Sequence, residues 1–262
     1  MIYKQAISVV LFGVFACCVY GQGSSAYDSK WQTKAIFGVN IPITKLYQGT
    51  EVDYLLGYDD NSYYWQILSV SYFFHKHWGL EFNFQTSISN RIRHRADYFN
   101  ANMESEYIDK YYIRSGSGTS NSEFSIMGGD MLRGYIGAIY RFETDKLYIY
   151  PKFSIGVTSL YTDWGRVDLK EKNSNNEFKV SYSNGKGVND YFTLASSASF
   201  GYKIMKRFYF NADIMFSYFR TNITYKKDFT NLYTNEHIVE HFDYKKNIFT
   251  LSLGVGLIFI IK

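Results

Sequence analysis

Beyond its first 21 residues, this 262-residue chain contains no cysteine. Disulfides, cysteine-based zinc sites and cysteine nucleophiles are therefore excluded once those residues are removed. The chain also lacks the repeated apolar runs of about 20 residues that a bundle of membrane-spanning helices needs. Its net charge is only +4 with no basic stripe, so nucleic acid is an unsuitable partner. What it has in abundance is aromatic side chains, with 26 Tyr, 22 Phe and 4 Trp.

The N-terminal segment 1–21 has the composition of an export signal. Lys4 supplies the positive start, an apolar core follows, and small residues occupy the −3 and −1 positions before Gln22. A lipoprotein signal is the alternative, because residues 14–17 resemble a lipidation box in which Cys17 would carry the lipid. We predict a signal peptide over 1–21 and a periplasmic linker over 22–30.

The remainder, 31–262, is predicted to form one all-β domain. Its segments alternate between two kinds of side chain with the two-residue period of a strand, and no sustained helical period appears. In the last segment, for example, Leu251, Leu253 and Val255 share one face, while Ser252 and Gly254 share the other. Eight segments of this kind stand out: 31–43, 62–74, 79–91, 130–142, 147–161, 191–202, 208–220 and 248–261.

The connections between these segments alternate in length. The short ones are 75–78, 143–146 and 203–207, and the long ones are 44–61, 92–129, 162–190 and 221–247. This alternation is typical of an up-and-down barrel with turns at one end and loops at the other. In outer-membrane barrels the turns face the periplasm, so eight strands would place both termini there.

The distribution of charge favours a transmembrane barrel over a soluble one. The apolar face is almost uncharged, and the other face is rich in Gly, Ser and Asn, whereas a soluble barrel would carry Lys and Glu on its solvent face. Aromatic residues gather near the segment ends, as in membrane-interface belts. The turn-end belt would hold Trp31, Tyr72, Phe74, Trp78, Tyr140, Phe142, Tyr202 and Phe208. The loop-end belt would hold Tyr63, Tyr64, Tyr161, Trp164, Phe192 and Phe249.

Two segments depart from the simple pattern. Segment 62–74 carries aromatic residues on both faces, so its inward face is ambiguous. Pro151 lies inside the fifth segment, where it has no N–H to donate to a neighbouring strand. We expect a local bulge at Pro151.

With this pattern the chain resembles the small outer-membrane β-barrel proteins of the eight-stranded OmpA/OmpX-like architecture. More narrowly, it is similar to the outer-membrane β-barrel domain family that includes PorT-like proteins. The resemblance covers about 31–262 and is strongest over the hairpin 72–81 and the C-terminal segment. It departs from the family at the C-terminus, where Lys262 replaces the usual terminal aromatic residue. The resemblance implies an outer-membrane location and an architecture, but no activity.

The interior of an eight-stranded barrel holds side chains and leaves little room for a diffusion pore. Six charged residues are predicted to point inward: Lys34, Glu81, Arg133, Arg141, Lys152 and Asp213. Buried charges must be paired, and counting from the turn end places Glu81 and Arg141 at similar depth, so we expect them to form an ion pair. The six charges sum to +2, so tyrosine hydroxyls or water must help, or one assignment is wrong. We interpret the set as a structural plug, with a gated proton or ion path as the alternative.

Arginines gather at the start of the longest connection, at Arg91, Arg93 and Arg95. They are candidate contacts for lipopolysaccharide, because a guanidinium group binds phosphate through two hydrogen bonds. The alternative is an ordinary solvated loop base.

Catalytic motifs are sparse. His237, Glu240 and His241 match the H-x-x-E-H pattern of a zinc-peptidase class. That chemistry needs one helix face and a third ligand, whereas this segment is expected in a surface loop. The H-x-S-N element of lipid A deacylases does not occur. We therefore predict no catalytic site, no metal and no cofactor.

The expected function is a structural or interaction role in the outer membrane, with no enzymatic activity. The long loops are rich in Tyr, Asn and Ser, which suits adaptable contacts with a protein partner. An accessory role in a secretion or outer-membrane assembly machine is the first alternative, implied by the resemblance to PorT-like proteins. A lipid A-modifying enzyme is the second.

Overall fold

The computed structural model describes residues 29–44, 61–89, 105–114, 118–119, 131–161, 165–184 and 188–261. The predicted signal peptide, most of the predicted linker, and Arg91, Arg93 and Arg95 lie outside these ranges. Within them strands predominate, with a short helical turn at 105–107. No helix among the described residues is long and apolar enough to cross a membrane.

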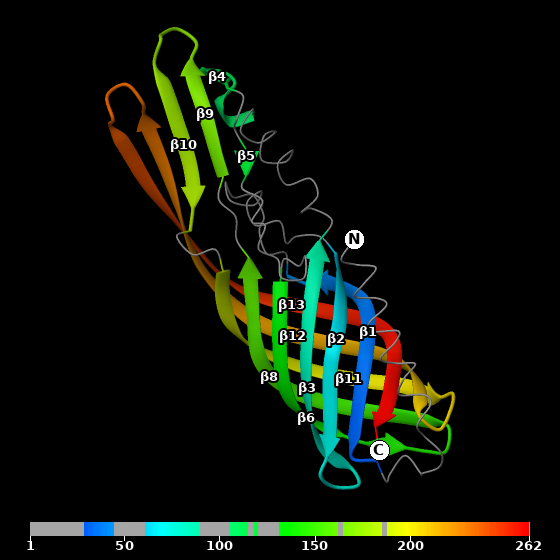
Figure 1. Cartoon of the computed structure of the whole chain (residues 1–262). Coiled ribbons are helices and arrows are strands. Elements are labelled where there is room, and N and C mark those ends of the chain that lie inside the picture. Colours follow the sequence, from blue (N-terminus) through cyan, green and yellow to red (C-terminus); the bar gives the residue numbers. More distant parts are fainter. Residues whose placement is uncertain are drawn as a thin grey trace.

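Eight antiparallel strands close into a barrel, in which each strand pairs with the next and β1 pairs with β13 (Figure 1). The short connections, the start of β1 and the end of β13 lie at one end of the barrel, which we call the turn end. The long connections lie at the opposite end, which we call the loop end. The strands are β1 (Trp31–Pro42), β2 (Ser62–Phe73), β3 (Trp78–Ser89), β6 (Met131–Tyr140), β8 (Leu147–Tyr161), β11 (Val188–Lys203), β12 (Phe208–Asn231) and β13 (His237–Ile261). The predicted eight-stranded up-and-down barrel is confirmed, and its first six strands agree with the predicted segments to within a few residues.

A register shift in β2 explains its ambiguous sequence. The pairing of β2 slips by one residue on both sides, between Gln66 and Leu68 against β3 and between Gln66 and Ser69 against β1. Such a bulge exchanges the two faces of a strand. Tyr64 and Gln66 are buried before the shift, and Ser69 and Phe73 are buried after it. Even-numbered residues therefore face inward before the shift, and odd-numbered residues face inward after it. This is why aromatic residues occur on both faces of the sequence pattern.

Pro151 does not produce the bulge that we predicted. The β8–β11 ladder runs past Pro151 in constant register, pairing it with Ala198. On the other side, the β6–β8 ladder ends at Ile139↔Lys152 and resumes as β7 (Phe142–Glu143) on β8 in the same register. The missing proline N–H thus interrupts the ladder for two residues without shifting it.

The long connections contain strands that the sequence pattern did not reveal. The β12–β13 hairpin keeps one register from Phe208↔Phe259 to Thr230↔His237, so most of the predicted loop 221–247 is strand. β9 (Gly165–Glu171) and β10 (Glu177–Ser183) arise within the predicted loop 162–190, and β10 pairs with β12. β4 (Tyr111–Ile113) and β5 (Gly118–Thr119) both pair with β9. These strands continue the sheet beyond the barrel, as Figure 1 shows, and we call them the sheet extension: β4, β5, β9, β10 and the outer parts of β12 and β13 (219–231 and 237–248).

The outer face of the barrel is apolar. Ile136, Phe153 and Val255 are 52%, 59% and 54% exposed, although each is large and hydrophobic. A continuous apolar surface around a closed barrel suits lipid. At the turn end Trp31 packs on Tyr72 and Trp78 on Tyr140, with ring centroids 4.6 and 4.7 Å apart, which forms the expected aromatic belt.

Tyr64, assigned from sequence to the loop-end belt, instead points inward and is only 2% exposed. Its ring occupies the space that a Cβ atom would need at Gly38 and at Gly254, which face each other on β1 and β13. In the same way Tyr148 lies over Gly201. The glycines of the polar face thus make room for inward tyrosines, which fill the barrel.

Candidate functional site

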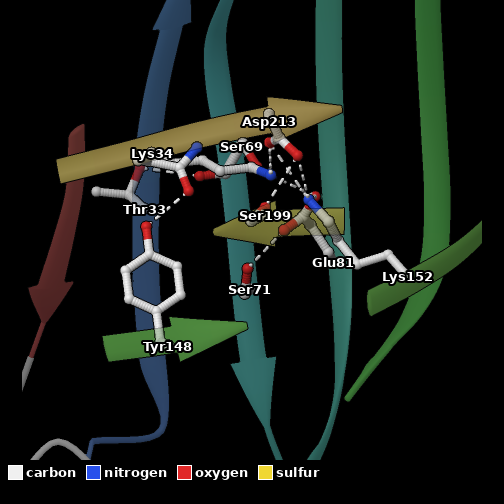
Figure 2. Close-up of polar contacts among 10 residues, drawn as sticks. Thr33, Lys34, Ser69, Ser71, Glu81, Tyr148, Lys152, Ser199 and Asp213 are labelled. Carbon is white, nitrogen blue, oxygen red and sulfur yellow. Dashed lines mark hydrogen bonds and ion pairs between the residues drawn. The ribbon is translucent and has the colours of Figure 1, made fainter. Parts of the chain in front are cut away.

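Four of the six predicted interior charges meet in the middle of the barrel (Figure 2). Lys34 Nζ lies 2.9 Å from Glu81 Oε1 and 3.0 Å from Asp213 Oδ2. Lys152 Nζ lies 3.3 Å from Glu81 Oε1 and 3.4 Å from Asp213 Oδ1. All four side chains are buried. Each ammonium group contacts both carboxylates, so this charged quartet is electrically neutral.

Neighbouring hydroxyl groups complete the quartet. Ser71 Oγ donates a hydrogen bond to Glu81 Oε2, and Ser199 Oγ donates one to Asp213 Oδ1, each with a donor–acceptor distance of 3.0 Å. Balanced charge together with added hydrogen bonds is what a buried ion cluster needs to be tolerated. A small hollow beside the quartet, lined in part by Gln32 and Tyr150, is too narrow for a water molecule. The geometry supports the interpretation of these residues as a plug.

The predicted ion pair between Glu81 and Arg141 is wrong. Arg141 lies at the turn end, where its Nε donates to the carbonyl oxygen of Lys76 over 2.9 Å and its Nη1 to that of Ser29 over 3.3 Å. Its guanidinium carbon lies 4.0 Å from the centre of the Phe73 ring. Its backbone N–H donates to His77, outside the β6 ladder, so Arg141 belongs to the closure of the barrel bottom. Counting residues along the sequence could not show that β6 ends at Tyr140, one residue before Arg141.

Arg133, the sixth predicted interior charge, is 1% exposed and lies in the loop-end half of the barrel. Its Nη2 donates a hydrogen bond of 3.4 Å to Thr250 Oγ1 of β13, on the opposite wall of the barrel. Its Nε and Nη1 have no hydrogen-bond partner, and no carboxylate among the described residues pairs with it. Since the quartet is neutral, the predicted surplus of +2 consists of Arg133 and Arg141.

The sequence analysis missed one buried ion pair. Lys203 Nζ lies 2.8 Å from Glu143 Oε2, and the Glu143 side chain is fully buried. The Tyr150 hydroxyl also donates to Glu143. The sequence pattern predicts a short connection over 143–146, but the pairing of β7 with β8 carries the inward alternation on to Glu143. Following the alternation two residues beyond Arg141 would have found it.

The sheet extension has its own apolar core, on the face that continues the inside of the barrel. Phe178 of β10 packs against Tyr111 of β4 and Phe229 of β12, with ring centroids 5.5 and 5.1 Å apart. The most deeply buried members are Leu160, Val167, Leu169, Val180, Tyr182, Phe219, Ile223, Tyr225 and Ile248. This core includes Leu160 of β8 and Tyr191 of β11 together with residues of β9 and β10, so it joins the extension to the barrel.

A buried lysine holds segment 105–114 against the extension. Lys227 Nζ lies 2.9 Å from Glu106 Oε1, with the rings of Tyr107 and Tyr182 beside it. Burial alone would lower the pKa of Lys227, but the hydrogen bond to Glu106 and the negative charge of that residue raise it above its usual value. Burial and the same carboxylate raise the pKa of Tyr107 to about 12. This ion pair and the protonated phenol add to the pairing of β4 with β9 and to the ion pair between Arg114 and Glu177, which hold the same segment.

The zinc-peptidase pattern does not form a metal site. His237, Glu240 and His241 lie on β13, in strand and not in the predicted loop, and all three are exposed. Alternation along a strand places both histidines on one face and Glu240 on the other. The three side chains therefore cannot converge on one ion.

No protein-family model matches the chain, and no curated protein matches it. Solved structures are similar to it in general architecture. Neisserial surface protein A is 10% identical with a TM-score of 0.44, covering 88% of this chain and 97% of that one. A major outer membrane protein from Thermus thermophilus is 9% identical with a TM-score of 0.39, covering 89% and 100%. The N-terminal β-barrel domain of Pseudomonas aeruginosa OprF is 13% identical with a TM-score of 0.33, covering 88% and 98%.

At these identities the likeness concerns architecture and says nothing of ligands or activity. The closed ring of eight antiparallel strands, the apolar outer face and the packed polar interior are features of the chain itself. By these features the chain has the fold of the small outer-membrane β-barrel proteins.

Proposed function

We propose that this protein is a non-enzymatic outer-membrane barrel that displays the sheet extension at the cell surface as a binding element for another protein. In this arrangement the turn end and both termini face the periplasm, because short turns of such barrels lie there. The quartet and the inward tyrosines block the lumen, so the barrel serves as an anchor. The single observation that carries the proposal is an edge of β13 with which no described strand pairs.

The direction of the backbone groups on β13 follows from its junction with β1. Ile43 N–H and Thr44 N–H both donate to the carbonyl oxygen of Phe249, at 2.9 and 3.3 Å. Phe249 therefore turns its backbone groups away from β12, and every second residue before it does the same while the register stays constant. Among the described residues, no strand pairs with this side of β13 between His237 and Asn247.

An open edge of this length is a template for an added strand, because its N–H and C=O groups can bond an extended segment of a partner. The edge also carries devices that limit indiscriminate pairing. Glu240, Asp243 and Lys245 are exposed along it, and such charges oppose the stacking of identical edges. We infer that a partner strand of complementary charge is admitted while aggregation is opposed.

Substitution at Val239 tests the edge directly. Val239→Pro removes one outward N–H without touching a β12 hydrogen bond, and Val239→Ala keeps the N–H as a matched control. Both variants carry a photo-crosslinking residue in place of His241, and whole cells that express them are irradiated in their growth medium. We expect a discrete surface adduct with Val239→Ala and its loss with Val239→Pro. Equal adducts in both variants would refute binding by strand addition.

The orientation is tested separately with single cysteines, since the chain has none beyond residue 21. Thr234→Cys lies at the tip of the β12–β13 hairpin and Lys76→Cys lies in a turn at the opposite end. A membrane-impermeant maleimide should label the first on intact cells and the second only after lysis. The reverse pattern would place the extension in the periplasm. Loss of secreted cargo in a deletion strain would instead favour the secretion role, and an altered lipid A mass would favour the enzyme.

A further inference from the structure

Among the described residues, Arg133 differs from every other buried cation named above in having no ionic partner and no pair of carbonyl acceptors. Lys34 and Lys152 share two carboxylates, Lys203 pairs with Glu143, and Arg141 donates to two carbonyl oxygens. Arg133 has one long hydrogen bond to Thr250 and two nitrogens with no partner. An arginine does not lose its proton in a protein, so this positive charge must be balanced in another way.

The surroundings of Arg133 prevent water or the protein from screening that charge freely. Below it lies the neutral quartet, and above it lies the apolar core that includes Met131, Phe219 and Ile248. The outer face of the barrel at this level is apolar. An isolated charge enclosed in this way is strongly unfavourable.

Hydrogen-bond donors are in excess on the same level of the lumen. Gln66, Gln85 and Arg133 face one another in sequence across β2, β3 and β6. The amide nitrogen of Gln66 is buried without a partner, as are two nitrogens of Arg133. The Ser217 hydroxyl, on β12, is also buried without a partner. The level thus combines one positive charge that no described carboxylate balances with several free donors from three walls of the barrel, against one free carbonyl acceptor, Gln85 Oε1.

We propose that a small monovalent anion of the halide class binds inside the barrel at Arg133, with Gln66 Nε2 and the Ser217 hydroxyl as further donors. The ion neutralises the charge of Arg133, within a lumen otherwise filled with side chains. Its role is to complete the charge balance of the barrel.

The first test measures the melting temperature of the purified, folded full-length mature protein in detergent. Sodium chloride is compared with sodium gluconate at equal ionic strength, because gluconate is too bulky to enter. A bound ion stabilises the folded state in proportion to the logarithm of its concentration above its dissociation constant. We expect the melting temperature to rise steadily with each tenfold increase in chloride. A flat response would overturn the proposal.

Two variants locate the effect. Arg133→Gln removes the charge and should abolish the chloride dependence, whereas Arg141→Gln also removes a buried arginine but should retain it. If Arg133→Gln fails to fold, crystals of the wild-type protein in sodium bromide decide the matter. An anomalous bromide peak within hydrogen-bond distance of Arg133 would support the proposal. Its absence there, or ordered water in its place, would refute it.

Discussion

The two halves of strand β12 show opposite patterns of hydrophobicity. Between residues 210 and 217, apolar side chains point out of the barrel and polar ones point in, whereas between 220 and 228 the polar side chains point out. The outward residues of the first half are Phe210, Ala212, Ile214 and Phe216, and those of the second are Arg220, Asn222, Thr224, Lys226 and Asp228. The register with β13 does not change between them.

This inversion shows that the surroundings of the strand change while its backbone does not. An apolar outer face suits lipid, and a polar outer face over an apolar core suits water. β13 inverts at the same level, where the outward residue Phe249 is apolar and the next residues on that face, Asn247, Lys245 and Asp243, are polar. One continuous hairpin thus marks the loop-end boundary of the membrane to within about one residue pair. The following predictions test this boundary and the interior on either side of it.

The largest effect is expected inside the barrel, where polar groups must be balanced. Asp213→Ala leaves Lys34 and Lys152 with one carboxylate between them, so the folded state should lose about 3–5 kcal/mol. The measurement is urea unfolding in lipid vesicles, followed by tryptophan fluorescence. A double variant, Lys152→Met with Asp213→Leu, removes one charge of each sign and should recover most of the loss. A double variant as unstable as Asp213→Ala would show that the charges are needed for more than mutual neutralisation.

A matched pair of lysines tests the boundary on one face of one strand. Ile214→Lys places a charge on the lipid face and should cost about 2–4 kcal/mol. Thr224→Lys lies on the same outward face of β12, beside Asp243, and should change the unfolding free energy by less than about 0.5 kcal/mol. Similar losses in both variants would mean that the extension also lies in an apolar environment.

The same inversion explains what could be predicted from the sequence. Alternation identified the eight barrel strands, because lipid on one side and a packed lumen on the other give every strand two distinct faces. It also led to the wrong ends for β12 and β13, since the pattern changes sign near Phe219 and Phe249 and looks there like the end of a strand. A pattern search that allowed the apolar face to change from outward to inward along one strand would have continued both strands into the extension.

The interior was predictable as a set of residues but not as a set of contacts. Alternation assigned Lys34, Glu81, Lys152 and Asp213 to the inside, yet the strand tilt that brings them to one level depends on the closure of the ring. The strands β4, β9 and β10 were missed for a different reason. They are short and belong to a sheet whose partner, the outer part of β12, had been assigned to a loop.

A smaller effect is expected from the ion pair that attaches segment 105–114 to the extension. Lys227→Met keeps the length of the side chain and removes its charge from Glu106, which is partly exposed, so about 1 kcal/mol should be lost. Because barrel unfolding need not report on this segment, the measurement is hydrogen exchange of 105–114 at neutral pH. Faster exchange confined to this segment is expected. Lys227→Arg should preserve the attachment, and unchanged exchange in Lys227→Met would contradict the role of the pair.

The smallest effect concerns the pH dependence of the same attachment. The folded state raises the pKa of Tyr107 from 10.0 to about 12 and also raises the pKa of Lys227. A group whose pKa is raised by folding contributes stability that is complete below its unfolded pKa and is lost as the pH rises through the folded value. Segment 105–114 should therefore stay attached up to about pH 10 and loosen between pH 10 and 12, while the barrel, whose charges are buried behind lipid, stays intact.

Limited digestion with an alkaline-tolerant protease measures this loosening. Cleavage within 105–114 should increase with pH while the unboiled protein keeps its fast gel mobility. Tyr107→Phe cannot ionise and should shift the onset of cleavage to higher pH, which distinguishes loss of the phenol from general alkaline unfolding. If Tyr107→Phe and wild type lose the segment at the same pH, the ion pair of Lys227, and not the phenol of Tyr107, sets the pH dependence of the attachment. If the barrel and the segment unfold together, the extension is not stabilised separately from the barrel. The boundary marked by the inversion of β12 would then separate lipid from water, but not two parts that unfold independently.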